Sequence, residues 1–220
     1  MMQELSVSGL SKSFGTKVLL DNAGFTLKTG EILGIFGSNG SCKSTLLKIL
    51  FGTVKAPPFS LQINNQQISA KDVIPKQLIA YLPQEPFIPK QLKVRDVIPL
   101  YYKGDTQDKL FYAPGIQRLA NSRVSQLSMG ELRYFELLLI GNLNHPFLML
   151  DEPFSMIEPL HKEKIKEFLV ALQPVKGIIV TDHYYRDVLS VSSKNLLLKN
   201  GSLIEVATEQ ELAANGYIPS

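Results

Sequence analysis

The sequence predicts an α/β fold in which a mostly parallel sheet is covered by helices and has an antiparallel β part attached. Short apolar runs alternate with helical patterns through the middle of the chain. Turn signals separate pairs of short strands on both sides of this region, which predicts hairpins at both ends that make up the antiparallel part. A glycine-rich stretch joins one apolar run to the helix that follows it.

Local signals support the individual elements. In the helix expected over residues 43–50, leucine and isoleucine recur at helical spacing. Asn200-Gly201 is a strong hairpin-turn dipeptide, and Thr208-x-x-Glu211 is a capping box that begins a last short helix. The expected elements in chain order are strand 31–36, helix 43–50, hairpin strands 60–63 and 67–68, strand 78–82, helix 131–143, strand 147–150, helix 158–172, strand 177–181, hairpin strands 195–199 and 202–206, and a helix from 208.

The segment from about residue 85 to 127 has a different character. Prolines crowd at positions 83, 86, 89 and 99, and the hydrophobic periodicity is weak. These features predict a small, mostly helical or irregular insert. The length of 220 residues fits one large domain, so we expect residues 1–220 to form a single domain that carries this insert.

Composition excludes several classes of function. A balance of 23 basic and 20 acidic residues gives a net charge of +3, which is too mild for a nucleic-acid-binding surface. Cys42 is the one cysteine, so no internal disulfide forms, as is typical of a reducing compartment. The N-terminus lacks the features of a signal peptide, and no apolar run approaches the roughly 20 residues that span a bilayer. Any membrane role therefore needs a partner.

The glycine-rich stretch has the pattern of a phosphate-binding loop. Such a loop turns successive backbone N–H groups inward to bind an anion in front of a helix N-terminus. Lys43 would reach the β and γ phosphates, the Ser44 hydroxyl would ligate Mg²⁺, and Thr45 would offer a further hydroxyl. The alternative is a glycine-rich turn that precedes Lys-Ser by chance. The expected ATP contacts are Gly37, Ser38, Asn39, Gly40, Ser41, Cys42, Lys43, Ser44 and Thr45.

Cys42 departs from the phosphate-loop pattern, because it occupies the place of the second glycine. A Cβ atom there could crowd the phosphates or disfavour the local backbone conformation. We interpret Cys42 as tolerated, with an altered affinity for nucleotide as one consequence. A thiol beside a helix N-terminus could also be oxidisable, a hypothesis that fails if thiol alkylation leaves ATP binding unchanged.

Two carboxylates follow a second buried strand. The four apolar residues 147–150 precede Asp151 and Glu152, so both acids lie at the carboxyl end of a strand, where open α/β sheets bind ligands. Asp151 would hold Mg²⁺ through the water shell of the ion, and Glu152 would act as the general base towards the attacking water. The alternative, a strand that ends in a solvated Asp-Glu turn, is disfavoured by the phosphate loop earlier in the chain.

Between these motifs, Leu127-Ser128-Met129-Gly130-Glu131 resembles the signature sequence of the ABC (ATP-binding cassette) family, except for Met129 in place of a second glycine. Ser128 and Glu131 also form a capping box, so a plain capped helix is the alternative. The resemblance extends from about residue 4 to 212. It implies a P-loop NTPase core with a mostly parallel sheet, an antiparallel β subdomain and a small, trimmed helical subdomain. In the family, Ser128 and Gly130 would face the γ-phosphate held by a second subunit.

The resemblance implies roles for further residues. Gln84 matches the glutamine that senses Mg²⁺ and the membrane partner, and His183 matches the switch histidine that contacts the γ-phosphate. Phe14 matches the aromatic residue that stacks on adenine, although an aromatic residue near a strand end is more often part of the core. Glu158 replaces the usual aspartate of the loop that links the two active sites in the family, and its longer side chain would alter communication between the sites.

The insert should also receive the membrane partner. Some of its apolar side chains would form a groove for a helix of that partner, while most would fill the core of the insert. The candidates are Phe87, Ile88, Val94, Val97, Ile98, Tyr101 and Tyr102.

The function that the resemblance implies is that of an ATP-binding and ATP-hydrolysing subunit of an ABC transporter. Two chains, as a homodimer, would enclose two MgATP and drive an integral membrane permease from the cytoplasmic face of the membrane, with no nucleic-acid partner. One alternative is a non-transport ABC ATPase, which the short chain and its single set of motifs disfavour. Another is a weakened or inert cassette that serves as a binding or regulatory module, which Cys42 and Glu158 favour.

Overall fold

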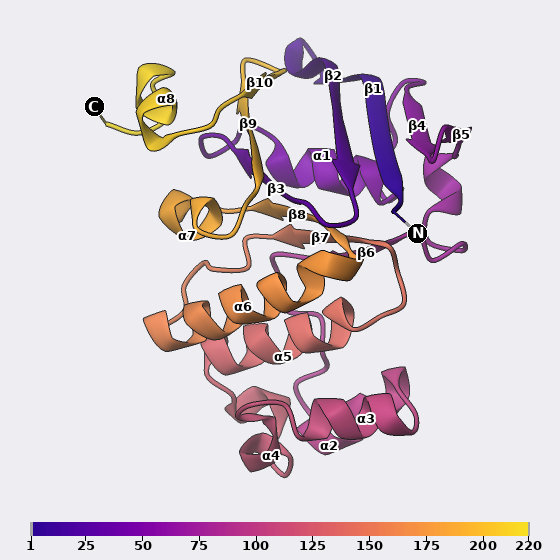
Figure 1. Ribbon diagram of the computed structural model, residues 1–220, viewed down its shortest axis with the longest axis vertical. Helices are drawn as coiled ribbons and strands as arrows, with labels where there is room; N and C mark the ends of the chain where they lie inside the picture. The colour runs from indigo at the N-terminus through magenta and orange to yellow at the C-terminus, as the bar shows by residue number, and fades with distance from the viewer. Residues whose placement is uncertain (1, 220) are drawn as a thin grey trace.

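Two sheets form the fold in the computed structural model, which describes residues 2–219 (Figure 1). The larger sheet has the strand order β10-β9-β3-β8-β7-β6, and all its neighbouring strands are parallel except β10 and β9. The predicted, mostly parallel sheet is thereby confirmed. Its strands are β3 (Ile32–Phe36), β6 (Ile79–Leu82), β7 (Phe147–Asp151), β8 (Gly177–Thr181), β9 (Lys194–Lys199) and β10 (Ser202–Glu205).

The smaller sheet is entirely antiparallel and has the order β2-β1-β4-β5. Its strands are β1 (Glu4–Phe14), β2 (Lys17–Lys28), β4 (Ser60–Ile63) and β5 (Gln66–Gln67). Asn64 and Asn65 both have positive φ, of 52° and 63°, as the tight turn between β4 and β5 requires. The β1–β2 pair was not predicted, because shifts in register between residues 7 and 13 interrupt the alternation that marks a strand.

The C-terminal hairpin does not belong to the antiparallel sheet, contrary to the expectation. β9 pairs in parallel with β3 and so extends the larger sheet, with β10 at its edge. Leu196, Leu197 and Leu198 are all buried, which is typical of a strand that is covered on both faces. A turn dipeptide indicates that two strands pair with each other, but it carries no information about the sheet that they join.

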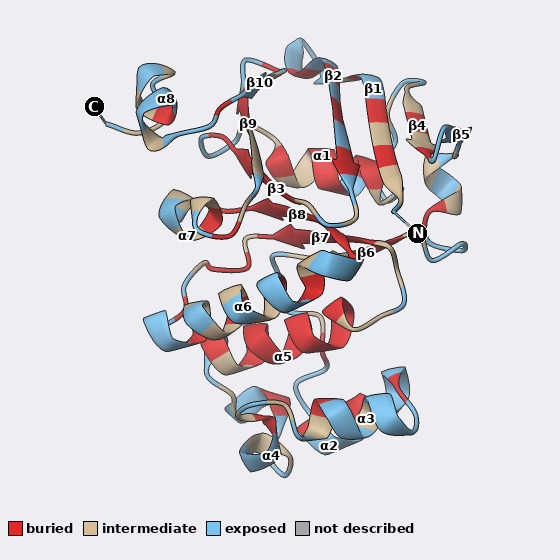
Figure 2. Ribbon diagram, in the orientation of Figure 1, coloured by how far each residue is buried: buried red, intermediate tan, exposed pale blue. Residues whose placement is uncertain are grey.

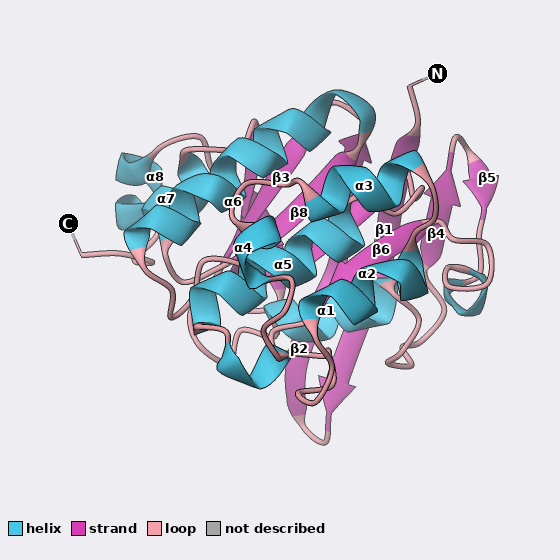
Figure 3. Ribbon diagram, turned by 90° about the horizontal axis from the view of Figure 1, so that it is seen from below, coloured by secondary structure: helices cyan, strands magenta, loops and turns pink. Residues whose placement is uncertain are grey.

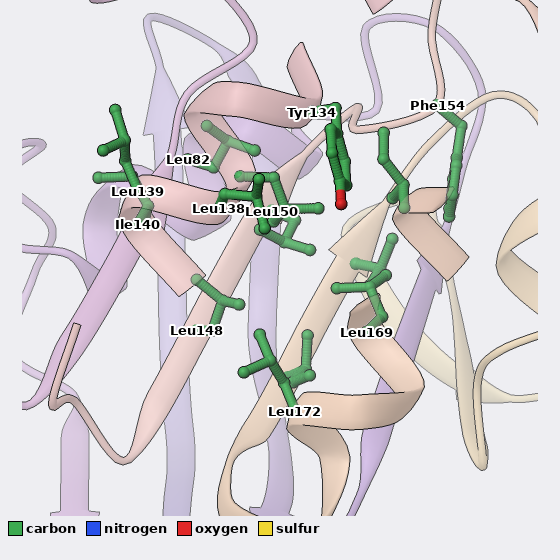
Figure 4. Close-up of a cluster of buried hydrophobic side chains, with 14 of the residues drawn as sticks. Leu82, Tyr134, Leu138, Leu139, Ile140, Leu148, Leu150, Phe154, Leu169 and Leu172 are labelled. Atoms are coloured by element: carbon green, nitrogen blue, oxygen red, sulfur yellow. The ribbon is translucent and has the colours of Figure 1, made fainter. Parts of the chain in front are cut away.

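Helix α1 (Lys43–Leu50) lies between the two sheets, where its leucines pack with both. On the opposite face of the larger sheet lie α5 (Met129–Gly141) and α6 (Pro159–Leu172). Figure 2 shows α5 buried along nearly its whole length, as its apolar sequence predicts. Figure 4 shows why, since Leu138 of α5, Leu150 of β7 and Leu169 of α6 meet in one core.

The insert between β6 and α5 is helical and lies beyond α5, away from the sheet (Figures 1 and 3). It contains α2 (Val94–Tyr101), α3 (Asp105–Phe111) and α4 (Ile116–Leu119), followed by a 3₁₀ turn (Val124–Gln126). The remaining helices are α7 (Tyr185–Leu189) and α8 (Glu209–Ala214), and further 3₁₀ turns occupy Ala70–Asp72 and Gln173–Val175. Within residues 2–219, none of the helices has the length and apolar character needed to cross a membrane.

Candidate active site

The loop between β3 and α1 wraps around its own lysine. The Lys43 ammonium donates to the backbone carbonyl of Gly37 at 2.6 Å and lies 3.4 Å from that of Ser38. Burial lowers the pKa of Lys43, while the nearby carboxylates of Glu152 and Asp151 act in the opposite direction. The positive charge therefore lies in the concave face of the loop, where an anionic group would bind.

Cys42 has a left-handed backbone conformation, with φ 76° and ψ 26°. A glycine adopts this conformation without strain, whereas a residue with a Cβ pays about 1–2 kcal/mol. The Cys42 thiol lies 3.4 Å from the Gly40 carbonyl, and α1 begins at the next residue. The one departure from the loop pattern thus falls at a position whose backbone favours glycine.

Asp151 lies at the end of β7 and is almost completely buried. Its Oδ1 accepts hydrogen bonds from the hydroxyls of Ser44 and Thr181, both at 3.0 Å. Its Oδ2 accepts from the Tyr81 hydroxyl at 2.9 Å. Burial, together with Asp151, raises the pKa of Tyr81, so the phenol stays a donor. Two of the three predicted magnesium ligands, Ser44 and Asp151, are therefore in direct contact although they are far apart in the sequence.

Glu152 is in contact with both other predicted catalytic residues. The His183 Nε2 lies 2.7 Å from Glu152 Oε1, and the Gln84 side-chain amide donates to Glu152 Oε2 at 2.9 Å. Ser155 contacts the same Oε2 at 3.3 Å. Glu152 itself has a φ of 53°, in the left-handed region where strained functional residues are found. The structure thus brings Gln84, Glu152 and His183 together from the ends of three neighbouring strands.

Sequence reasoning did not identify the residues that hold these loops in place. Asp182 is fully buried and accepts from the backbone N–H groups of Phe154 at 2.7 Å and Tyr184 at 3.1 Å, and from the Ser155 hydroxyl at 3.0 Å. Burial raises the pKa of Asp182, and these donors act against that effect. Tyr81 and Thr181 were missed as well. Their signal was available, because each lies within three residues of a predicted site residue at the end of a strand.

Two hollows flank the phosphate loop. The larger, of about 880 Å³, contains most of the predicted site and is lined, among others, by Asn39, Gly40, Cys42, Lys43, Ser44, Thr45, Gln84, Glu152 and His183. The smaller, of about 450 Å³, is lined by Ser38 and Ser41 and by parts of β2 and β9. Phe14 lies outside both hollows. It is 59% exposed at the end of β1, with the Lys12 ammonium 4.8 Å above its ring.

The predicted signature residues form the beginning of α5. The Ser128 hydroxyl accepts from the Glu131 backbone at 3.2 Å, and Glu131 accepts from the Ser128 backbone at 3.0 Å, so the capping box is present. Ser128 is exposed and lies outside the hollow that contains Lys43. A Cβ on Gly130 would lie 2.7 Å from the carboxylate of Glu158, so glycine permits the close approach of α6.

This arrangement agrees with the comparison with known proteins. The sequence profile of the family described as "ABC transporter" matches residues 20–155, which is more than half of the chain. The chain belongs to the ABC transporter family. As an ATP-binding subunit of that family it is an ATPase, and it binds nucleotide, as the phosphate loop and the paired carboxylates predicted.

Individual ABC relatives align over nearly the full length. The lipopolysaccharide export system ATP-binding protein LptB of Escherichia coli K12 is 28% identical over 99% of this chain and 95% of its own length. LptB of Haemophilus influenzae is 27% identical, with coverage of 96% and 93%. An uncharacterized ABC transporter ATP-binding protein of Methanocaldococcus jannaschii is 25% identical, with coverage of 96% and 80%.

Solved ABC structures have the same fold. A nucleotide-free ATP-binding cassette from an ABC transporter superposes with a TM-score of 0.84 at 21% identity, covering 99% of this chain and 96% of its own. The ADP conformation of another ATP-binding cassette gives a TM-score of 0.82 at 22% identity, with coverage of 100% and 96%. The predicted fold class is thereby confirmed, including the antiparallel and helical parts.

Proposed function

We propose that two copies of this chain enclose two MgATP and hydrolyse them to drive an integral membrane partner. The observation that carries the proposal is the contact of Glu152 with both Gln84 and His183, next to the Ser44–Asp151 pair. This cluster supports the proposal, because a carboxylate next to the residues expected to bind the γ-phosphate and its metal ion could serve as the base. We further propose that residues 1–220 act as one nucleotide-binding domain.

The ATP phosphates would replace the backbone carbonyls as partners of Lys43. The ammonium is held by Gly37 and Ser38, within the loop that would cradle the phosphates. Nucleotide binding would move it outward towards the β and γ phosphates, while the backbone of residues 37–45 and the N-terminus of α1 contribute N–H groups. We retain Phe14 as the adenine-stacking residue, because its exposed ring at the end of β1 is free to take a base on one face.

Ser44, Asp151 and Gln84 would hold Mg²⁺. The Ser44 hydroxyl and the Asp151 carboxylate already lie 3.0 Å apart, and hydroxyl, carboxylate and amide oxygens are the ligands that Mg²⁺ prefers. Mg²⁺ typically takes few protein ligands and completes its shell with water and phosphate oxygens. When bound, it neutralises charge that develops on the phosphates.

Glu152 would accept a proton from the attacking water. Gln84, His183 and Ser155 occupy three of the roughly four acceptor sites of its carboxylate, so a water can bind at the remaining site or replace one of these partners. His183 would then turn to the γ-phosphate. Ser128 and Gly130 would meet the nucleotide of the partner copy, which accounts for their position outside the hollow of Lys43.

The membrane partner would bind at the helical insert, and the chain would lie on the cytoplasmic face of the membrane through that partner. Of the apolar groove candidates, Ile88, Val94, Val97, Ile98 and Tyr102 are buried and belong to the core. Phe87 is only partly buried and Tyr101 is 40% exposed, so these two are the candidates that remain. Phe87→Asp should therefore abolish stimulation by the partner and leave basal ATP binding intact. Loss of both properties together would contradict this assignment.

The decisive experiment is to measure the mass of Glu152→Gln protein with and without MgATP by light scattering on a sizing column. The variant removes the base but keeps every binding group, so it should accumulate as an ATP-dependent dimer. Glu163→Gln, on the exposed side of α6, is the matched control and should turn ATP over without accumulating a dimer.

A variant that binds ATP in a titration but stays monomeric would contradict the homodimer. A variant that does not bind ATP would support the second candidate function, an inert binding module. That alternative is favoured by one observation, the left-handed backbone of Cys42 in the phosphate loop.

A further inference from the structure

Arg133 is a buried charge that takes no direct part in the proposed binding or hydrolysis of ATP. It lies near the beginning of α5 and is 5% exposed. A guanidinium that is removed from water is destabilising unless its donors are paired. The partners of Arg133 therefore indicate which parts of the protein it holds in place.

The donors of Arg133 reach the backbone of two loops that carry catalytic residues. One guanidinium nitrogen donates to the Pro83 carbonyl at 2.5 Å, directly before Gln84. The other donates to the carbonyl of Asp151 and lies 3.3 Å from that of Glu152. The guanidinium thus connects the peptide groups on both sides of the Gln84–Glu152 contact.

Glu136, one turn further along α5, completes the arrangement. It is fully buried and lies 3.7 Å from Arg133, while its other oxygen accepts from the backbone N–H of Phe87 at 2.8 Å. Arg133 and Glu136 therefore form hydrogen bonds with the two ends of the segment from Pro83 to Phe87. This segment contains Gln84 and leads into the face proposed for the membrane partner.

We propose that Arg133 is a positioning residue that links the nucleotide contact at the beginning of α5 to Glu152 and Gln84 of the same chain. The inference rests on the proposed function, because the nucleotide at the N-terminus of α5 is the one held by the second copy. A shift of α5 on closure of the dimer would move the guanidinium, and with it the peptide groups that orient Gln84 and Glu152. The two active sites would be coupled through one rigid helix.

The geometry makes lysine an informative replacement. A lysine keeps the charge opposite Glu136, but its single ammonium cannot span the two carbonyls that a planar guanidinium bridges. Arg133→Lys should therefore fold and bind ATP, with a Kd within about twofold of that of the original protein. The carboxylate of Glu152, however, should no longer be held in the position that catalysis requires. Misplacement on the order of 1 Å lowers turnover by up to about 100-fold, so kcat should fall between about 10- and 100-fold.

The test compares kcat, the Kd for ATP and dimer formation. Arg133→Lys combined with Glu152→Gln should still dimerise with MgATP, because the signature residues are intact, whereas Arg133→Lys alone should show the fall in kcat. Arg118→Lys is the matched control, since Arg118 is 64% exposed and its ion pair with Glu131 also lies at the beginning of α5. It should leave kcat unchanged.

A fall in kcat that is matched by loss of ATP binding or of the dimer would overturn the proposal, since Arg133 would then be merely structural. A kcat equal to that of Arg118→Lys would overturn it as well. If Arg133→Lys does not fold, Glu136→Gln provides the same test, because it keeps an acceptor for Phe87 and alters the charge that holds the guanidinium. Failure of Glu152→Gln alone to dimerise is a different result and concerns the proposed function.

Discussion

The two halves of the active site are stabilised in opposite ways. In the phosphate loop, Lys43 is held by the carbonyls of Gly37 and Ser38, within seven consecutive residues. At the end of β7, by contrast, Asp151 and Glu152 are held by distant parts of the chain. Their side chains and carbonyls contact groups from β6, α1, α5 and β8, and from the loops that follow β6 and β8. The first half is a local structure, whereas the second exists only after distant elements have packed.

This difference explains how the chain tolerates Cys42 in the phosphate loop. Cys42 can strain the phosphate loop without disturbing other elements, because the loop is held by its own backbone. A change near Asp151 would leave buried polar groups of several elements without partners, and such groups are expensive to bury. Substitutions should therefore have larger effects at the end of β7 than in the loop.

The largest effect is expected for Glu152→Gln. Loss of the general base should lower kcat by about 10²–10⁴-fold, while the Kd for ATP stays unchanged because the phosphate loop is untouched. Steady-state hydrolysis and a nucleotide-binding titration measure the two quantities separately. Glu163→Gln serves as the control, and a parallel loss of affinity would show that the two halves are not independent.

Tyr81→Phe should come next. It removes the 2.9 Å hydrogen bond to the buried Asp151 carboxylate and leaves Oδ2 without that donor. Hydrogen bonds to charged groups contribute about 1.5–3 kcal/mol, so the free energy of unfolding should fall by about that amount in urea. Tyr112→Phe, at a residue that is 72% exposed, is the control and should have no effect. Equal urea-unfolding midpoints for Tyr81→Phe and Tyr112→Phe would show that the hydrogen bond from Tyr81 to Asp151 does not stabilise the protein.

Asp182 should make the stability depend on pH. Burial raises the pKa of Asp182 in the folded protein above its ordinary value of 3.8, so between these two pKa values the folded state holds a proton that the unfolded state has released. Its contribution is therefore most favourable below the ordinary value and decreases as the pH rises to the raised pKa, by at most about 1.4 kcal/mol per pH unit.

Urea unfolding of the original protein and of Asp182→Asn at pH 4 to 7 measures this dependence. As the pH rises, the original protein should lose unfolding free energy relative to Asp182→Asn. A difference that is constant with pH would contradict the raised pKa of Asp182.

The smallest effect is expected for Cys42→Gly. Glycine relieves the left-handed strain but loses conformational entropy, so the net gain in the free energy of unfolding should be about 0.5–1 kcal/mol. Cys42→Ala is the matched control, because alanine removes the thiol and keeps the Cβ. A gain in the glycine variant alone would assign the effect to the backbone. Equal values in both variants would assign it to the thiol.

Much of the fold and of the site could be predicted because the signals are local. Short patterns predicted the strands β3, β7 and β8, the capping box of Ser128 and Glu131, and the acids at the end of β7. The β1–β2 pair was missed because shifts in register interrupt the alternation of β1. The placement of the β9–β10 hairpin was missed because β9 pairs with β3, which is far away in the sequence. Arg133 and Asp182 were missed because a single polar residue in a helix or after a strand does not reveal its partner, whereas Tyr81 lies three residues before Gln84 and could have been found.

The sequence by itself determined the family, the phosphate loop and the identity of the acids at the end of β7, because each motif consists of residues that are neighbours along the chain. Only the tertiary structure decided that Ser44 meets Asp151, that Gln84 and His183 share one carboxylate, and that Arg133 bridges two loops. The physical reason is the parallel sheet, which brings the ends of β3, β6, β7 and β8 to one edge and makes the buried charges there each other's partners.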